Sequence, residues 1–136
     1  MKLSVVIPAR NEEGSVAETV SALWHTLQAA AIPCEIIVVD DGSTDTTAAI
    51  VRGLSASAPE IRLIQNLGRH GFGMAVRCGL SAATGEAMAI VMADGSDSPE
   101  DVVQCYRRLL DGPIASLAPA SYVAARYMTT PSTSWS

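Results

Sequence analysis

One stretch of the sequence, VMADGSDSPED (residues 91–101), gathers carboxylates at a density that suggests binding chemistry. After an apolar run come Asp94, Asp97, Glu100 and Asp101, four acidic side chains within eight positions. Such a group either lies on a solvated loop or holds a cation, and Mg²⁺ and Mn²⁺ both prefer carboxylate oxygens. A proline precedes the last two acids, and Pro-Glu-Asp is typical of a helix start. The stretch therefore leaves Asp94 and Asp97 as candidate metal ligands.

Three further polar sets could contribute to a binding site. They are residues 8–14 (PARNEEG), 40–45 (DDGSTD) and 66–71 (NLGRHG). Each also has an ordinary structural explanation, because Asp-Asp-Gly forms turns and acidic residues favour helix N-termini. His70, in the third set, is placed in the candidate cleft, and of its two interpretations, a site residue or a solvated loop side chain, we favour the second. The sequence contains neither GxxxxGK[ST] nor GxGxxG, so the two common phosphate-binding loops are not predicted.

The elements that must position these sets follow from the hydrophobic pattern. Short β-rich runs occur at residues 2–8, 34–43, 61–66 and 86–95, and the second is ended by Asp-Asp-Gly and the fourth by Asp-Gly. Between and after them, apolar residues recur at helical spacing in residues 14–31, 44–57, 72–84 and 99–111. Strands that alternate with helices predict a three-layer α/β/α fold with a mostly parallel, Rossmann-like sheet. The nearly continuous apolar strands agree, because such strands are buried on both faces.

All four polar sets come directly after a predicted strand, whereas the loops that lead into the strands (AAAIP, SASAPE and SAATGE) contain no such group of polar residues. In an open parallel sheet, ligands bind outside the carboxyl ends of the strands. We therefore expect the four sets to lie along one edge of the sheet and to face a common cleft. This alignment favours a binding site over four independent turns.

Length, charge and cysteine content narrow the class of protein. The 136 residues are enough for one domain, and the net charge of −5 argues against a protein that binds nucleic acid. Three scattered cysteines and no run of about 18 apolar residues predict a reduced, cytoplasmic chain without a membrane span. The periodic pattern stops near residue 112. We expect one domain over residues 1–112 and a weakly structured or aberrant tail over residues 113–136, with one short element around residues 122–128.

Four segments together resemble the successive motifs of a known family: VVIPARNEEGSV, IIVVDDGSTDTT, NLGRHGFGMAVRCGLSAATGE and VMADGSDSPEDV. They are similar to family 2 glycosyltransferases with a GT-A fold, and above all to the dolichol-phosphate mannosyltransferase-like branch that uses polyprenyl phosphates. The resemblance runs from about residue 3 to residue 112. It implies a nucleotide-diphospho-sugar donor, Mg²⁺ or Mn²⁺, and transfer of the sugar with inversion to an acceptor such as a polyprenyl phosphate.

The resemblance also implies roles for particular residues. The loop after the first strand would wall the nucleotide, the acidic pair after the second would reach the base or ribose, and the loop after the third would lie near the diphosphate. The nucleotide-sugar residues so implied are Pro8, Ala9, Arg10, Glu12, Asp40, Asp41, Asn66, Arg69 and Gly71. Asp94 would ligate the metal.

The sequence departs from the family pattern in two places. The family's acidic motif is Asp-x-Asp; Asp94 falls on its second aspartate, and Met92 falls on the first. Asp97 is then a substitute ligand or a supporting group. The acceptor-binding half is not recognisable after residue 112, so no catalytic residue is assigned. We expect the N-terminal donor-binding part of an enzyme, which keeps the fold but does not turn over alone.

Two other classes of protein remain as alternatives. A non-catalytic α/β module, such as a receiver-like domain, could bind a metal or nucleotide through the acidic pair, but it would place that pair after the first strand. A nucleotidyltransferase of similar topology would begin with a Gly-rich basic loop, which PARNEEGS does not supply.

Overall fold

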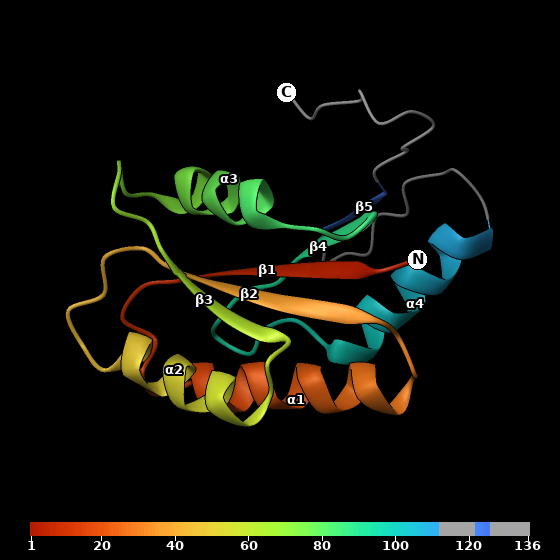
Figure 1. Ribbon diagram of the computed structural model, residues 1–136, viewed down its shortest axis with the longest axis horizontal. Coiled ribbons are helices and arrows are strands. Elements are labelled where there is room, and N and C mark those ends of the chain that lie inside the picture. Colours follow the sequence, from red (N-terminus) through yellow and green to blue (C-terminus); the bar gives the residue numbers. More distant parts are fainter. Residues whose placement is uncertain (112–121, 126–136) are drawn as a thin grey trace.

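Strands and helices alternate along the chain in the computed structural model, which describes residues 1–111 and 122–125 (Figure 1). The elements in chain order are β1 (Leu3–Ala9), α1 (Val16–Ala29), β2 (Cys34–Asp40), α2 (Thr47–Ser57), β3 (Ile61–Gln65), α3 (Phe72–Ala82), β4 (Ala87–Ile90), α4 (Pro99–Asp111) and β5 (Tyr122–Ala125). The four strand–helix pairs expected from the hydrophobic pattern are all present.

The strands form one sheet in the order β3-β2-β1-β4-β5. The first four are parallel, with Ile7 opposite Val38 and Val5 opposite Ala89, whereas β5 pairs antiparallel with β4. The chain moves outward from β1 to β3 and then crosses back to place β4 on the other side of β1. The loops after β1 and β4 therefore flank the topological switch point, where open α/β sheets bind ligands.

Alternate residues of the strands face two separate cores, which explains why β1 and β2 are almost wholly apolar. Val5 and Ile7 belong to the larger core, which lies under α1, α2 and α4. Val6, Ile37 and Val39 belong to the smaller core, which lies under α3 (Figure 1). Helices on both faces confirm the three-layer α/β/α prediction.

A glycine lets α3 approach the sheet closely. A Cβ atom built on Gly79 would lie 2.4 Å from a methyl carbon of Val6 and 3.0 Å from one of Val39. Real Cβ atoms do not approach other heavy atoms so closely, so a side chain at this position would push α3 away from the strands.

A buried polar cluster lies at the amino ends of the strands, away from the loops that the sequence singled out. Glu35 accepts hydrogen bonds from Ser4 Oγ at 2.7 Å, Thr84 N at 2.6 Å and Arg62 Nη1 at 2.8 Å. The cluster links β1, β2 and β3 to the turn between α3 and β4. Sequence reasoning missed it because Ser4, Glu35 and Arg62 are single polar residues inside apolar strands.

Most of the predicted tail falls outside the described residues, since only β5 is described beyond residue 111. The boundary at residue 112 and the character of residues 113–136 stay predictions, although β5 coincides with the start of the short element expected around residues 122–128. Within the described part of the chain, no helix is both long and apolar enough to cross a membrane.

Candidate functional site

The loops after β1 and β2 are joined into one surface by side-chain hydrogen bonds. Asn11, which has a φ of 53°, accepts a bond from Thr44 N at 2.8 Å, and its own N–H donates to Ser43 Oγ at 2.9 Å. Glu13 accepts a bond from Thr46 Oγ1 at 2.7 Å. These contacts fix the two loops against each other at the carboxyl edge of the sheet, as the alignment of polar sets predicted.

The two aspartates after β2 are both buried, and both accept hydrogen bonds from backbone N–H groups. Asp40 Oδ1 accepts from Ser43 N at 3.0 Å and so closes its own turn. Asp41 accepts from Asn66 Nδ2 at 2.8 Å and from Gly71 N at 2.8 Å. Asp41 is thus the anchor that holds the loop after β3 beside the loop after β2.

The ionisation of Asp41 follows from these contacts. Burial alone would raise the pKa of this carboxyl group, but hydrogen bonds from Gly71, Asn66 and His70 lower the pKa below its ordinary value. Asn66 also bonds within its own loop: its side-chain amide donates to Arg69 O at 2.8 Å and accepts from Gly68 N at 3.2 Å. A fixed negative charge therefore organises the whole 66–71 loop.

The remaining residues of the first loop differ in what they can offer a ligand. Ala9 is buried, and its carbonyl accepts a bond from Asp41 N at 2.9 Å. Pro8 is half-buried, whereas Arg10 is exposed, as is Arg69 across the edge. Glu12 is half-buried and accepts a bond from Ser15 Oγ at 3.0 Å. Arg10 and Arg69 are thus the exposed cations that these loops can present to an anionic ligand.

The two candidate metal ligands have different surroundings. Asp94 is exposed; its Oδ1 accepts a bond from Ser96 N at 2.9 Å, and hydrogen bonds from Ser96 lower its pKa. Asp97 is buried, and its Oδ2 accepts a bond from Met92 N at 2.7 Å. Asp97 therefore closes the loop, and Asp94 is the freer of the two carboxylates.

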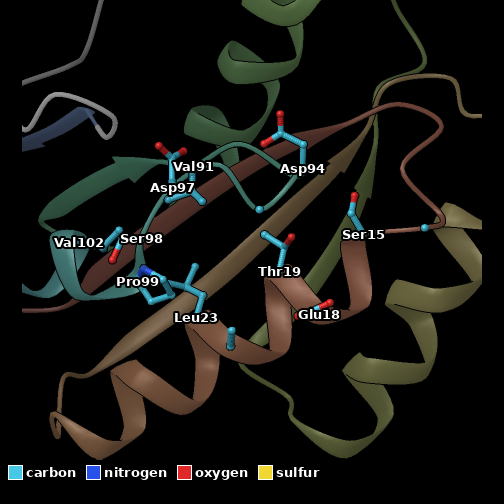
Figure 2. Close-up of a pocket in the computed structure, with 13 residues that line it drawn as sticks. Ser15, Glu18, Thr19, Leu23, Val91, Asp94, Asp97, Ser98, Pro99 and Val102 are labelled. Atoms are coloured by element: carbon cyan, nitrogen blue, oxygen red, sulfur yellow. The ribbon is translucent and has the colours of Figure 1, made fainter.

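A cavity of about 320 Å³ lies between this loop and α1 (Figure 2). Ser15, the residue before α1, and Thr19 on α1 tie the two elements together by donating hydrogen bonds to Ala93 O at 3.0 and 3.1 Å. Figure 2 shows the Asp94 carboxylate pointing away from Ser15 and Thr19. The acid predicted to hold a metal is thus directed away from the α1 side of the loop.

The described residues suit a metal held jointly with a ligand rather than by protein alone. Within residues 1–111 and 122–125, no three His, Cys, Asp or Glu side chains come together as a metal-binding group. Mg²⁺ typically uses one or two carboxylates and takes its other oxygens from phosphates and water. One exposed, ionised aspartate fits that requirement.

Sequence reasoning placed the four loops at the correct edge but missed two residues that connect them. Asn11 lies in the quoted PARNEEG segment, and the available signal was its residue type, because Asn adopts the positive φ found here more readily than most residues. His70 was interpreted as a solvated side chain. In the structure its side chain is 45% exposed, but Nδ1 lies 3.0 Å from Asp41 Oδ1.

Comparisons with known proteins bear on this site. The family model "Glycosyl transferase family 2" matches residues 4–131. The dolichol-phosphate mannosyltransferase of Pyrococcus furiosus is 32% identical over 112 residues, which are 82% of this chain and 31% of that protein.

Two solved structures share the fold. The mannosyltransferase PcManGT from Pyrobaculum calidifontis, in complex with GDP-Man and Mn²⁺, superposes with a TM-score of 0.70 at 26% identity over 83% of this chain and 33% of its own. Glucosyl-3-phosphoglycerate synthase from Mycobacterium tuberculosis, in complex with Mn²⁺, UDP and phosphoglyceric acid, superposes with a TM-score of 0.66 at 28% identity. The match covers 84% of this chain and 41% of that protein. This chain spans about a third of the length of the curated relative.

Proposed function

This chain belongs to glycosyl transferase family 2, and from that premise we propose that it binds a nucleotide-diphospho-sugar at the carboxyl edge of its sheet. The observation that carries the proposal is the joining of the strand-end loops there, around the buried, ionised Asp41 and beside the exposed Asp94. The solved neighbours with GDP-Man or UDP support a donor of this class.

Each loop would then have its own task in donor binding. Pro8, Ala9, Arg10 and Glu12 would wall the nucleotide, and Asp40 and Asp41 would hold the turn that faces the base or ribose. Asn66, Arg69 and Gly71 would lie near the diphosphate. Arg69 suits that place because an exposed guanidinium pairs with phosphate oxygens in a bidentate manner.

Asp94 would hold a divalent cation, Mg²⁺ or Mn²⁺, together with the donor diphosphate, and Asp97 would support the loop. When bound, such a cation stabilises the negative charge that gathers on the departing nucleoside diphosphate. Asp94 can take this role because an aspartate is ionised at neutral pH, and the hydrogen bonds from Ser96 that lower its pKa favour the same carboxylate form. The Mn²⁺ complexes of the two solved neighbours support a divalent metal.

For the whole protein we propose transfer of the sugar, with inversion, to an acceptor such as a polyprenyl phosphate. The name of the Pyrococcus furiosus relative supports this class of acceptor. Inversion would arise from direct displacement at the anomeric carbon. A phosphate acceptor is already anionic near neutral pH, so the reaction needs no strong general base.

Calorimetric titration tests the donor site. GDP, UDP and their sugars are titrated into the 136-residue chain with and without Mn²⁺. We expect metal-dependent binding that Asp94→Ala weakens by at least roughly 10- to 100-fold, because loss of a direct ligand should cost no less than loss of the outer groups that support a metal site. Glu86→Ala is the matched control, because Glu86 is an exposed acid directly before β4, at the amino end of the strand that Asp94 follows.

Two outcomes would contradict the proposal. If no nucleotide binds under any condition, the chain has no donor site. If binding depends on the metal but is unchanged in Asp94→Ala, the ligand assignment is wrong even though the site exists.

A further inference from the structure

His70 lies at the junction of the loops after β2 and β3. Its Nδ1 atom is 3.0 Å from Asp41 Oδ1, while the backbone N–H of the next residue, Gly71, donates to the other oxygen of the same carboxylate. The two oxygens of Asp41 thus bond to two consecutive residues of the loop after β3, one oxygen to each. Among the contacts described for residues 66–71, Asn66 reaches Asp41 through its amide, Gly71 through its backbone N–H and His70 through an aromatic ring. That ring could also contact a ligand.

The Asp41 contact determines the tautomer of the His70 ring. An ionised carboxylate can only accept hydrogen bonds, so the hydrogen between the two groups must belong to Nδ1. In the neutral ring Nε2 therefore carries the lone pair, and in the cationic ring both nitrogens donate. The bond to Asp41 persists in either form, so the ring orientation does not depend on its charge.

The ring also packs against the turn that follows β2. A Cβ atom built on Gly42, whose φ is +80°, would lie 2.8 Å from His70 Cε1 and 3.0 Å from Nε2. The absence of a side chain at Gly42 thus makes room for the imidazole. Two independent contacts, one polar and one steric, hold the same ring.

We propose that His70 is a positioning residue that locks the Asn66–Gly71 loop onto the β2 turn in the conformation that receives the donor diphosphate. This inference rests on the proposed function, because it assigns His70 to the same site. The charged group that His70 contacts is Asp41 from the β2 loop, and the residue before His70 in the chain is the exposed Arg69. By fixing the loop, His70 would hold the exposed Arg69 near the ligand before the ligand arrives.

Nucleotide titration of His70 variants provides the first test. We expect His70→Ala to weaken binding of GDP or UDP with Mn²⁺ by roughly tenfold, as expected for loss of a hydrogen bond to a charged group. His70→Asn should restore most of that affinity, because its amide can donate to Asp41 from nearly the place of Nδ1. His25→Ala is the control, since the other histidine of the chain is exposed on α1.

A double-mutant cycle tests the lock without any ligand. Gly42→Ala introduces backbone strain at positive φ in every background, but its new methyl group clashes with the imidazole ring only when His70 is present. We expect the shift in urea midpoint caused by Gly42→Ala to be smaller in the His70→Ala background than in the wild type. Nitrogen-15 spectra of the ring should show hydrogen on Nδ1.

The outcomes separate this inference from the proposed function. If the wild-type chain binds no nucleotide, the proposed function is refuted. The double-mutant cycle would still show whether His70 locks the loops. Binding that is equal in wild type and His70→Ala would overturn the inference and leave the donor site intact. Equal midpoint shifts in the two backgrounds would show that His70 does not lock the loops.

Discussion

Asp41 and Asp94 have the same side chain and follow parallel strands, yet their surroundings give them different tasks. Asp41 is 5% exposed and accepts bonds from a backbone N–H, an amide and an imidazole. Asp94 is exposed and bonds locally to Ser96. A buried carboxylate that is saturated by donors organises structure, whereas an exposed one remains available to a cation.

Asp41→Asn tests this division at the scale of the residue. All of the groups that face Asp41 are donors, so the new amide would direct its own N–H groups at one of them and leave it unsatisfied. We expect a loss of about 2 kcal/mol in the free energy of unfolding, the usual cost of such a mismatch. Asp94→Ala should change stability by less than about 0.5 kcal/mol. Urea unfolding measures both, and equal midpoints for Asp41→Asn and wild type would refute the anchoring role.

The positions of these residues could be predicted from sequence, but their surroundings could not. The rule that ligand groups follow parallel strands placed all four loops at one edge without any coordinates. The rule could not distinguish Asp41 from Asp94, because the exposure of each side chain depends on which neighbouring loop covers it. Asp41 is covered by the loop after β3. His70 was underestimated for the same reason, since its partner lies 29 positions away in the sequence.

At the scale of the element, strand and helix types were predictable and their ends were less so. The fourth strand was expected to include Val91 and Met92 and to be ended by Asp94-Gly95, but β4 ends at Ile90. Val91, just past β4, still donates a hydrogen bond from its N–H to Val6 O of β1 at 3.0 Å, and the next N–H, that of Met92, donates to the Asp97 carboxylate at 2.7 Å. The Met92 N–H thus bonds within its own loop, to a side chain five positions further along, although the apolar pattern continues past Ile90.

Glycines in two helices show how packing changes the effect of one substitution. Gly79 of α3 faces Val6 and Val39, whereas a Cβ built on Gly53 of α2 meets nothing within 4 Å. Gly79→Ala should destabilise the protein by roughly 1–3 kcal/mol through overpacking. Gly53→Ala should stabilise it by roughly 0.5–1 kcal/mol, because alanine is the better helix former. Thermal unfolding of the pair checks this, and two shifts of the same sign would argue against the close approach of α3.

At the scale of the whole molecule, the two edges of the sheet have separate tasks. The carboxyl edge carries the loops proposed to bind the donor, and the amino edge carries the cluster around Glu35. Glu35 and Asp40 lie near opposite ends of β2, about 17 Å apart at the rise of an extended strand. Separation on this scale predicts that the amino-edge cluster affects stability and leaves the donor loops unchanged.

The pH dependence of folding should reveal the contribution of Glu35. Burial alone would raise the pKa of this group, but hydrogen bonds from Ser4, Thr84 and Arg62 lower it from 4.5 to about 2. Because the folded state has the lower pKa, the stabilisation is fully present above about pH 4.5 and is lost as the pH falls toward 2.

Glu35→Gln should therefore cost roughly 3 kcal/mol of unfolding free energy at pH 7, and the difference from wild type should shrink between pH 4.5 and pH 2. Glu60→Gln, a change to an exposed acid just before β3, is the matched control and should show no such trend. Urea unfolding across this pH range makes the measurement. At pH 7, folded Glu35→Gln should bind nucleotide like the wild type, and weaker binding would mean that the two edges of the sheet are coupled.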